Sequence, residues 1–197
     1  NILLLLISYY RSRLTGRPQL AGMPGTMSIE PTTACNLRCP QCPSGLRSFS
    51  RPTGSLSMEL YQKIIDENQR HLSYLMLYFQ GEPYIHPRFT DMVAYASSRN
   101  IYTATSTNAH FLTEENAEKT VRSGLHRLIV SLDGTTQEVY EKYRIEGSLE
   151  KVKEGLLNLK KVKEKYKSNK PYTILQFVVF GHNEHQMDEA KRFKMIY

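Results

Sequence analysis

The run Tyr74-Leu75-Met76-Leu77-Tyr78-Phe79 is almost continuously apolar and decides the fold class. A strand that other elements cover on both faces has this composition. Residues 173–180 repeat the same character farther along the chain, and three shorter strand-like runs occupy residues 27–30, 101–105 and 127–132. The sequence therefore predicts five strands, of which two are buried on both faces.

Helical patterns separate the strand-like runs, and several carry a recognisable start signal. Ser57 precedes a helix that we expect to turn Leu60 inward, and Thr113 precedes two glutamates that suit the positive end of a helix. Thr135 and Glu138 have the spacing of a capping box. Strands that alternate with helices form a parallel sheet or an α/β barrel, so the chain predicts five strand–helix units of that class.

The two ends of the chain differ from this pattern. Residues 1–26 predict a lead-in segment, irregular from residue 12 onward because glycine and proline recur there, and residues 27–197 predict one core domain. The chain begins with Asn1 and stops at Tyr197 within a helical pattern, so we expect a core that is incomplete at its C-terminus. Residues 2–7 are apolar but too short to cross a bilayer, and they lack the flanks of a secretory signal. We therefore expect a cytoplasmic protein with no membrane partner.

The net charge of +7 permits an anionic partner without identifying one, in a chain whose 40% hydrophobic and 23% charged composition is ordinary for a globular protein. Much of the positive charge falls in residues 151–170. Apolar residues recur there with three-four spacing, which predicts an amphipathic helix with its lysines outside. We interpret these lysines as a solvated helix face, and we do not expect a nucleic-acid partner.

Only three cysteines occur, Cys35, Cys39 and Cys42, and they directly follow the first strand-like run. An odd number packed this closely makes a poor disulfide framework, which favours a reduced compartment and a role in metal binding. Loops that follow parallel strands gather at one end of the sheet, where functional sites form. A cubane iron–sulfur cluster normally takes four cysteines, so three would leave one iron open to an exogenous ligand, as a catalytic cluster requires.

Two other interpretations of the cysteines stay open. A structural zinc ion requires a fourth ligand. His71, His86 and His110 are candidates in principle, although none has the ligand spacing of a zinc finger. An iron–sulfur electron carrier usually completes its cluster with a fourth cysteine, which this segment lacks. A non-catalytic iron–sulfur or zinc-binding module is therefore the alternative to an enzyme.

Four further segments follow the strand-like runs in an order that matches a known family. Gln80-Gly81-Glu82-Pro83 follows the second run, Ser106-Thr107-Asn108-Ala109 the third and Ser131-Leu132-Asp133-Gly134 the fourth, with Tyr143-Arg144-Ile145-Glu146-Gly147-Ser148 beyond it. Together with the CxxxCxxC spacing of the cysteines, these segments resemble the motifs of the radical S-adenosylmethionine (radical SAM) superfamily. The arginine segment resembles that of the branch which bears a SPASM extension.

The resemblance implies a fold and two cofactors. The fold is a partial (βα)6 TIM-type barrel, of which about five βα units are present. The cofactors are a [4Fe–4S] cluster on Cys35, Cys39 and Cys42, and S-adenosylmethionine on its open iron. The resemblance assigns cofactor contacts to Gln41, Gln80, Gly81, Glu82, Pro83, Ser106, Asn108, Ser131, Asp133, Arg144 and Val179.

Roles for several of these residues follow from the family's motifs. Glu82 and the backbone at Gly81 receive the amino group of S-adenosylmethionine, because a carboxylate and carbonyl groups accept hydrogen bonds from an ammonium. Arg144 offers a rigid fork for the carboxylate, and Ser131 and Asp133 face the ribose hydroxyls. These assignments are expectations that the resemblance implies.

Simpler roles are the alternatives at three positions. Arg144 has possible ion-pair partners on its own segment, Glu141 and Glu146, and Ser106 and Asn108 suit a turn without any ligand.

The sequence also departs from the family pattern at three positions. Gln41 stands where an aromatic residue is usual, and Gln80 and Ala109 stand where glycine is usual. A hydrogen bond from Gln41 would replace the stacking of an aromatic ring on adenine. The three cysteines themselves keep the full pattern.

The resemblance also implies an activity. The reduced cluster donates one electron to S-adenosylmethionine, which cleaves into methionine and a 5′-deoxyadenosyl radical that abstracts hydrogen from a substrate. We expect a peptide, protein or small-molecule substrate, and flavodoxin or ferredoxin as the electron donor. A nucleic-acid-modifying enzyme of the same family is the alternative, supported only by the basic charge. No residue is assigned to the substrate side.

Overall fold

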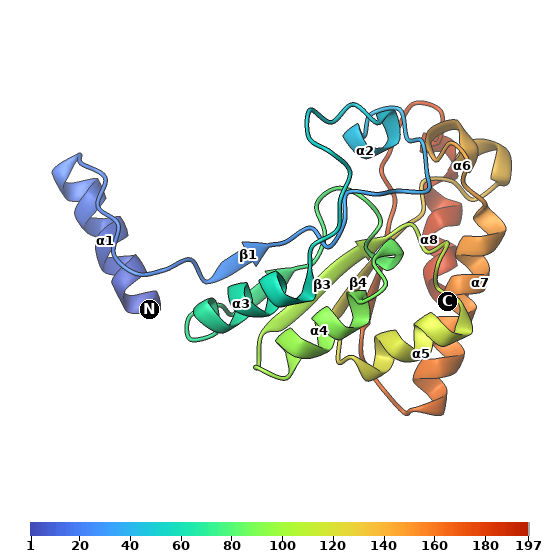
Figure 1. Cartoon of the computed structure of the whole chain (residues 1–197). Helices are drawn as coiled ribbons and strands as arrows, with labels where there is room; N and C mark the ends of the chain where they lie inside the picture. Colours follow the sequence, from blue (N-terminus) through green and yellow to red (C-terminus); the bar gives the residue numbers. More distant parts are fainter. Residues whose placement is uncertain (197) are drawn as a thin grey trace.

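Five parallel strands form one sheet in the computed structural model, which describes residues 1–196 (Figure 1). Each strand pairs with the next one along the chain, in the order β1-β2-β3-β4-β5. The sheet does not close between β1 and β5, so the fold is a partial α/β barrel, and the predicted fold class is confirmed. The strands are β1 (Thr26–Ser28), β2 (Tyr74–Met76), β3 (Tyr102–Thr107), β4 (Arg127–Ser131) and β5 (Tyr172–Gln176).

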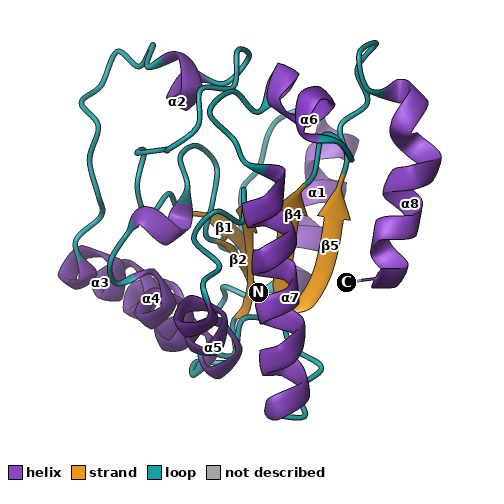
Figure 2. Ribbon diagram, turned by 90° about the vertical axis from the view of Figure 1, so that its right-hand side faces the viewer, coloured by secondary structure: helices purple, strands orange, loops and turns teal. Residues whose placement is uncertain are grey.

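Helices connect the strands and cover one face of the sheet. Figure 2 shows α3, α4, α5 and α7 side by side along this face, with α2 and α6 beyond the strand ends. The helices are α1 (Ile2–Thr15), α2 (Pro43–Leu46), α3 (Met58–Asn68), α4 (Phe89–Ser97), α5 (Glu114–Arg122), α6 (Gln137–Tyr143), α7 (Leu149–Lys165) and α8 (Met187–Ile196), with short 3-10 turns η1 (Pro83–Ile85) and η2 (Glu184–Gln186).

One apolar core lies between the sheet and these helices. Leu75 and Leu128 project from the strands and are fully buried against helical side chains such as Met92 and Val152. The three-four pattern of residues 151–170 is confirmed, because α7 buries its apolar stripe and leaves its lysines outside.

One predicted helix start and one predicted buried residue need correction. Ser57 caps α3 as predicted, since its hydroxyl accepts a hydrogen bond from the Leu60 amide, but Leu60 itself is half exposed and the helix buries Tyr61 instead. The cap of α6 is Thr136 and not Thr135, because the Thr136 hydroxyl accepts from the Val139 amide. Thr113 caps α5 as expected.

The predicted lead-in contains regular structure that the sequence pattern did not indicate. Residues 2–15 form helix α1, and Gly16 ends it in a left-handed conformation. Figure 1 shows α1 standing apart from the sheet, to which residues 16–25 connect it. The fifth strand is also shorter than predicted, and residues 177–180 form a loop beyond its end.

Gly155 allows α7 to approach the turn that follows β3. A β-carbon at this position would lie 2.8 Å from the Cβ of Leu112 and 2.9 Å from the carbonyl oxygen of Ala109. These contacts are too short for any real side chain, so α7 or the turn would have to move apart. The glycine therefore sets the position of the turn as well as that of the helix.

We predict that Gly155→Ala destabilises the chain, although alanine favours helices more than glycine does. The overpacked contact should lower the free energy of unfolding by about 1–3 kcal/mol. Urea titration followed by circular dichroism measures the change. Lys161→Ala, at an exposed position of the same helix, is the control and should stay within about 0.5 kcal/mol of the parent. A stabilised Gly155→Ala variant would contradict the close packing.

Candidate active site

The loops after all five strands meet at the carboxyl end of the sheet. This follows from the parallel order, because every strand runs in the same direction. The cysteine loop follows β1, and α2, which begins at Pro43, continues from it. Figure 1 shows α2 and α6 above this end of the sheet. The parallel topology therefore places the predicted site segments at the same end of the sheet.

The loop after β2 packs directly against the backbone that leads into the cysteines. Gly81 has a φ of 76°, and a β-carbon there would lie only 2.3 Å from the carbonyl oxygen of Thr32. Only glycine accepts this approach. The Gly81 amide donates to the Ser44 hydroxyl at 2.9 Å, and the Glu82 amide donates to the Ala34 carbonyl at 2.8 Å. These two bonds attach the loop after β2 to residues just before and just after the three cysteines.

The three thiols are free, and the surroundings of two of them disfavour the thiolate in the absence of a cation. Burial raises the pKa of Cys35 to about 11, and burial likewise raises the pKa of Cys39. Iron supplies the positive charge that makes such thiols ionise and bind.

The thiols do not converge on one point. Within residues 1–196, no group of three or more histidine, cysteine, aspartate or glutamate side chains is close enough to hold one metal ion. A cubane carries its four irons on separate corners, so its cysteines need not converge on a single point. The buried hydroxyl of Tyr140 lacks a hydrogen-bond partner, and Arg144 ends the same helix.

Glu82 is buried in the middle of the site and holds the turn after β3. Its carboxylate accepts hydrogen bonds from the Thr107 hydroxyl at 2.7 Å, the Asn108 amide at 2.7 Å and the Tyr84 amide at 3.3 Å. Asn108 in turn donates from its side chain to Asn36, which lies between two of the cysteines, at 2.8 Å. Burial raises the pKa of Glu82 to about 7 despite these hydrogen bonds. The structure thus places Glu82 and Asn108 in one connected group.

Asp133 and Arg144 form a buried ion pair. The Arg144 Nε and Nη2 atoms each lie 2.6 Å from the Oδ2 atom of Asp133, which is fully buried. The remaining guanidinium nitrogen, Nη1, donates to the sulfur of Cys39 at 3.7 Å. The expected alternative for Arg144, a surface pair with Glu141 or Glu146, is not what the structure shows.

The loop after β5 is fixed by a residue that the sequence did not suggest. Asn183 is fully buried, and its side-chain amide donates to the carbonyl oxygens of Asp133 at 3.0 Å and Val178 at 2.9 Å. The Val178 amide donates to Asp133 Oδ1 at 2.8 Å. A buried polar side chain at a strand end is recognisable only once the loops are in place.

The other predicted contacts lie at different distances from the cysteines. Gln80 accepts a hydrogen bond from the Cys42 thiol at 3.4 Å, Pro83 begins η1, and Gln41 is exposed beside the loop. Ser106 is the penultimate residue of β3 and Ser131 the last residue of β4, so both lie at the carboxyl end of the sheet.

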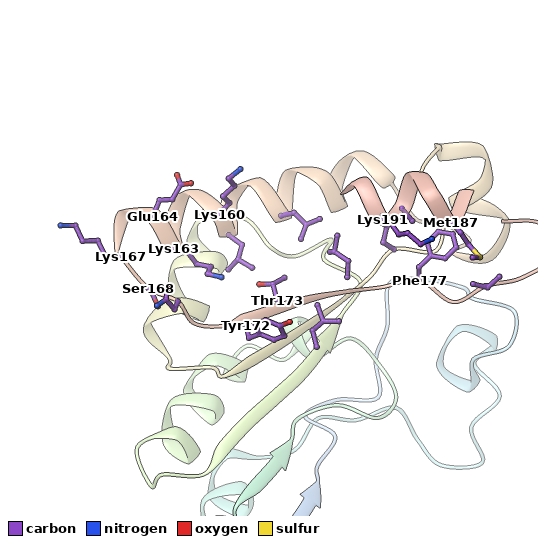
Figure 3. Close-up of a pocket in the computed structure, with 18 residues that line it drawn as sticks. Lys160, Lys163, Glu164, Lys167, Ser168, Tyr172, Thr173, Phe177, Met187 and Lys191 are labelled. Carbon is purple, nitrogen blue, oxygen red and sulfur yellow. The ribbon is translucent and has the colours of Figure 1, made fainter. Parts of the chain in front are cut away.

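Val179 is placed differently from the other predicted contacts. It is 51% exposed and lines a cavity of about 960 Å³ between α7, β5 and α8. Figure 3 shows this cavity, with Phe177 and Met187 at one end and Lys163 at the other. The structure therefore brings Gln80, Gly81, Glu82, Asn108, Asp133 and Arg144 together around the cysteines, whereas Val179 faces the neighbouring cavity.

The buried ion pair leads to a prediction for stability. Replacing one partner leaves the other charge buried without compensation, so Asp133→Asn should lower the free energy of unfolding by about 3–5 kcal/mol. The double variant Asp133→Asn with Arg144→Gln should recover part of this loss, which a double-mutant cycle by chemical denaturation measures. Glu115→Gln breaks the exposed pair with Lys119 and serves as the control, with a change below about 0.5 kcal/mol. If the loss in the double variant equals the sum of the losses in Asp133→Asn and Arg144→Gln alone, the two side chains are not coupled.

The raised pKa of Glu82 leads to a prediction for pH dependence. Between its ordinary pKa of 4.5 and its raised pKa of about 7, the unfolded chain releases this proton and the folded chain keeps it. Stability should therefore fall as the pH rises through this window, by about 3 kcal/mol in total, relative to Glu82→Gln, which does not titrate. Denaturation of the metal-free parent and variant at several pH values measures the difference. A difference that stays constant across the window would show that the buried carboxyl does not titrate there.

Comparison with known proteins agrees with this geometry. The sequence matches the Radical SAM superfamily over residues 29–193. The "Tungsten-containing aldehyde ferredoxin oxidoreductase cofactor-modifying protein" of Pyrococcus furiosus is 32% identical over 169 residues, which are 84% of this chain and 46% of that protein. Mycofactocin maturase MftC of Mycobacterium tuberculosis is 35% identical over 136 residues, 69% of this chain and 34% of the relative.

Solved structures show the same fold. The structure of anSMEcpe with bound AdoMet and Kp18Cys peptide superposes with a TM-score of 0.63 at 19% identity, over 87% of this chain and 48% of that one. The chain spans less than half the length of the two curated relatives above. Because the family match runs through nearly all of the sequence, the chain belongs to the radical SAM superfamily, whose cofactors are a [4Fe–4S] cluster and S-adenosylmethionine.

Proposed function

We propose that this chain is the cofactor-binding part of a radical SAM enzyme, which abstracts hydrogen from a peptide or small-molecule substrate. Cys35, Cys39 and Cys42 hold the [4Fe–4S] cluster. The cluster and S-adenosylmethionine together supply a one-electron cleavage that starts the hydrogen abstraction. The single observation that carries the proposal is three free cysteines on the loop after β1, with the loops of the other strands bonded around them.

The residues around the cysteines provide a binding surface for S-adenosylmethionine. The side chain of Gln80 accepts from the Cys42 thiol, the amide of Gly81 bonds to Ser44 beside the cysteine loop, and Glu82 supports the adjoining turn. Arg144 keeps one guanidinium nitrogen on the cysteine side of its ion pair, where it would bind an anionic group such as a carboxylate. Ser131 and Asp133 lie at the end of β4, on the side proposed for the ribose.

The distribution of contacts modifies two of the expected roles. Glu82 is 2% exposed and already accepts three hydrogen bonds, so its first effect is to position the turn at Asn108. Asp133 is fully buried and accepts from Arg144 and Val178, so it acts on the cofactor through Arg144. We therefore assign these two acids as positioning residues and leave direct contacts to Gln80, Gly81 and Arg144.

The relatives favour a substrate of the peptide class. MftC is named as a maturase, and anSMEcpe was solved with a bound peptide. The resemblance of the segment at residues 143–148 to the SPASM-bearing branch points the same way. We propose a peptide or protein substrate first, a small molecule second, and flavodoxin or ferredoxin as the electron donor.

Anaerobic reconstitution of the protein that carries this chain tests the proposal. Iron and sulfide should give a cluster whose electron paramagnetic resonance signal changes on addition of S-adenosylmethionine. Reduction should then yield methionine and 5′-deoxyadenosine, measured by liquid chromatography. Cys39→Ala should lose the S-adenosylmethionine-sensitive signal and at least 100-fold of the 5′-deoxyadenosine, as expected when a cluster ligand is removed (roughly two orders of magnitude or more).

The matched control is Ser48→Ala, an exposed position in the segment that follows the cysteines. It should load the cluster and form 5′-deoxyadenosine at the parent's rate. If the cluster-loaded parent forms no 5′-deoxyadenosine and behaves like Cys39→Ala, the chain belongs to a non-catalytic iron–sulfur module. If the protein retains zinc in place of iron under these conditions, a zinc-binding module replaces both the enzyme and the iron–sulfur module as the interpretation.

A further inference from the structure

The N-terminal arm, residues 1–25, exposes an unusual amount of apolar surface. It consists of α1 and a return segment that runs back along it from Gly16. Leu14 is 85% exposed and Leu20 is 97% exposed, which is far from the usual burial of leucine. The other large apolar side chains exposed on the arm are Ile2, Leu3, Leu4, Leu6, Ile7, Tyr9, Tyr10 and Met23. So many exposed apolar side chains on one short segment mark a contact with another molecule or with lipid.

Hydrogen bonds from Asn1 and Ser12 hold the return segment against α1. The side chain of Asn1 donates to the Met23 carbonyl at 2.7 Å and accepts from the Met23 amide at 2.8 Å. The Ser12 hydroxyl accepts from the Gln19 amide at 2.8 Å. Ser8 is the one buried residue of α1. Because the serines and Asn1 hold the return segment, the leucines and isoleucines are left to the outside.

The charge of the arm identifies the kind of partner. Residues 1–29 contain Arg11, Arg13 and Arg17 and no aspartate or glutamate. Arg11 and Arg17 are exposed, and Arg13 donates to the hydroxyl of Tyr9. A surface that is both apolar and positive complements an anionic lipid surface, whereas a second copy of the arm would bring like charges together.

The residue types of α1 suit contact with lipid. It carries two tyrosines and two arginines beside its leucines and isoleucines. In proteins that contact a bilayer, tyrosine rings sit at the level of the headgroups, and arginines are attracted to anionic headgroups. Within the described residues, no helix is long and apolar enough to cross a membrane.

We infer that the N-terminal arm docks on an anionic membrane surface. This inference replaces the expectation that the chain has no membrane partner, and it is independent of the proposed catalytic function. The arginines contact lipid headgroups, and the leucines and isoleucines of α1 enter the boundary of the acyl chains.

Sedimentation with vesicles tests the inference. The chain should pellet with phosphatidylcholine vesicles in which phosphatidylglycerol makes up roughly one third of the lipid, and much less with pure phosphatidylcholine, with binding that weakens as salt rises. Arg11→Gln with Arg17→Gln should weaken binding to the anionic vesicles by roughly 30-fold. Leu3→Gln with Leu14→Gln should weaken it by at least about tenfold, because two leucines no longer leave water.

Matched controls lie on distant helices. Lys161→Gln with Lys170→Gln removes the same charge from exposed positions near α7, and Leu60→Gln with Leu157→Gln removes two partly exposed leucines. Both controls should bind like the parent, and circular dichroism should show unchanged helix content in all variants.

Three results would overturn the inference. The first is that the parent does not bind anionic vesicles, and the second is that the arm variants and the controls lose affinity equally. The third is self-association: if the parent is a dimer by analytical ultracentrifugation without lipid, and Leu3→Gln with Leu14→Gln makes it monomeric without affecting vesicle binding, the arm is an interface between copies of the chain.

Discussion

The buried ion pair between Asp133 and Arg144 is the constraint on which the arrangement of the site depends. A carboxylate with no exposed surface needs a compensating charge, and Arg144 supplies it from the end of α6. The same carboxylate accepts the amide of Val178, and the same guanidinium reaches the sulfur of Cys39. One interaction therefore connects the loops after β1, β4 and β5.

Glu82 performs a similar task on the other side of the cysteines. Its three hydrogen bonds hold η1 and the turn after β3, and that turn contacts Asn36 within the cysteine loop. The two acids thus position loops by being buried and satisfied, not by facing solvent. Cys35 and Cys39 are desolvated, so their pKa values are raised, and ligation to iron is the route by which these two thiols become thiolates.

The catalytic end of the sheet and the N-terminal arm are separate parts of the molecule. The arm connects to the first residue of β1, Thr26, whereas the cysteines follow the last residue of that strand. Figure 1 shows α1 on one side of the sheet and α2 with the site loops at another. A chain that rests on lipid through its arm would keep the cysteine loop open to a substrate and an electron donor from solution.

The sequence by itself determined the alternation of strands and helices, the fold class and the cysteine loop. Hydrophobic runs and helix caps depend on neighbours in the chain, and residues such as Ser57 and Thr113 therefore behaved as predicted. The motif residues could be named because each directly follows a strand, and parallel strands all end on one side. Only the tertiary structure decided which of them touch: that Arg144 pairs with Asp133, that Asn183 holds the loop after β5, and that α1 leaves its leucines exposed. These outcomes depend on burial and on partners far apart in the sequence, which local patterns do not contain.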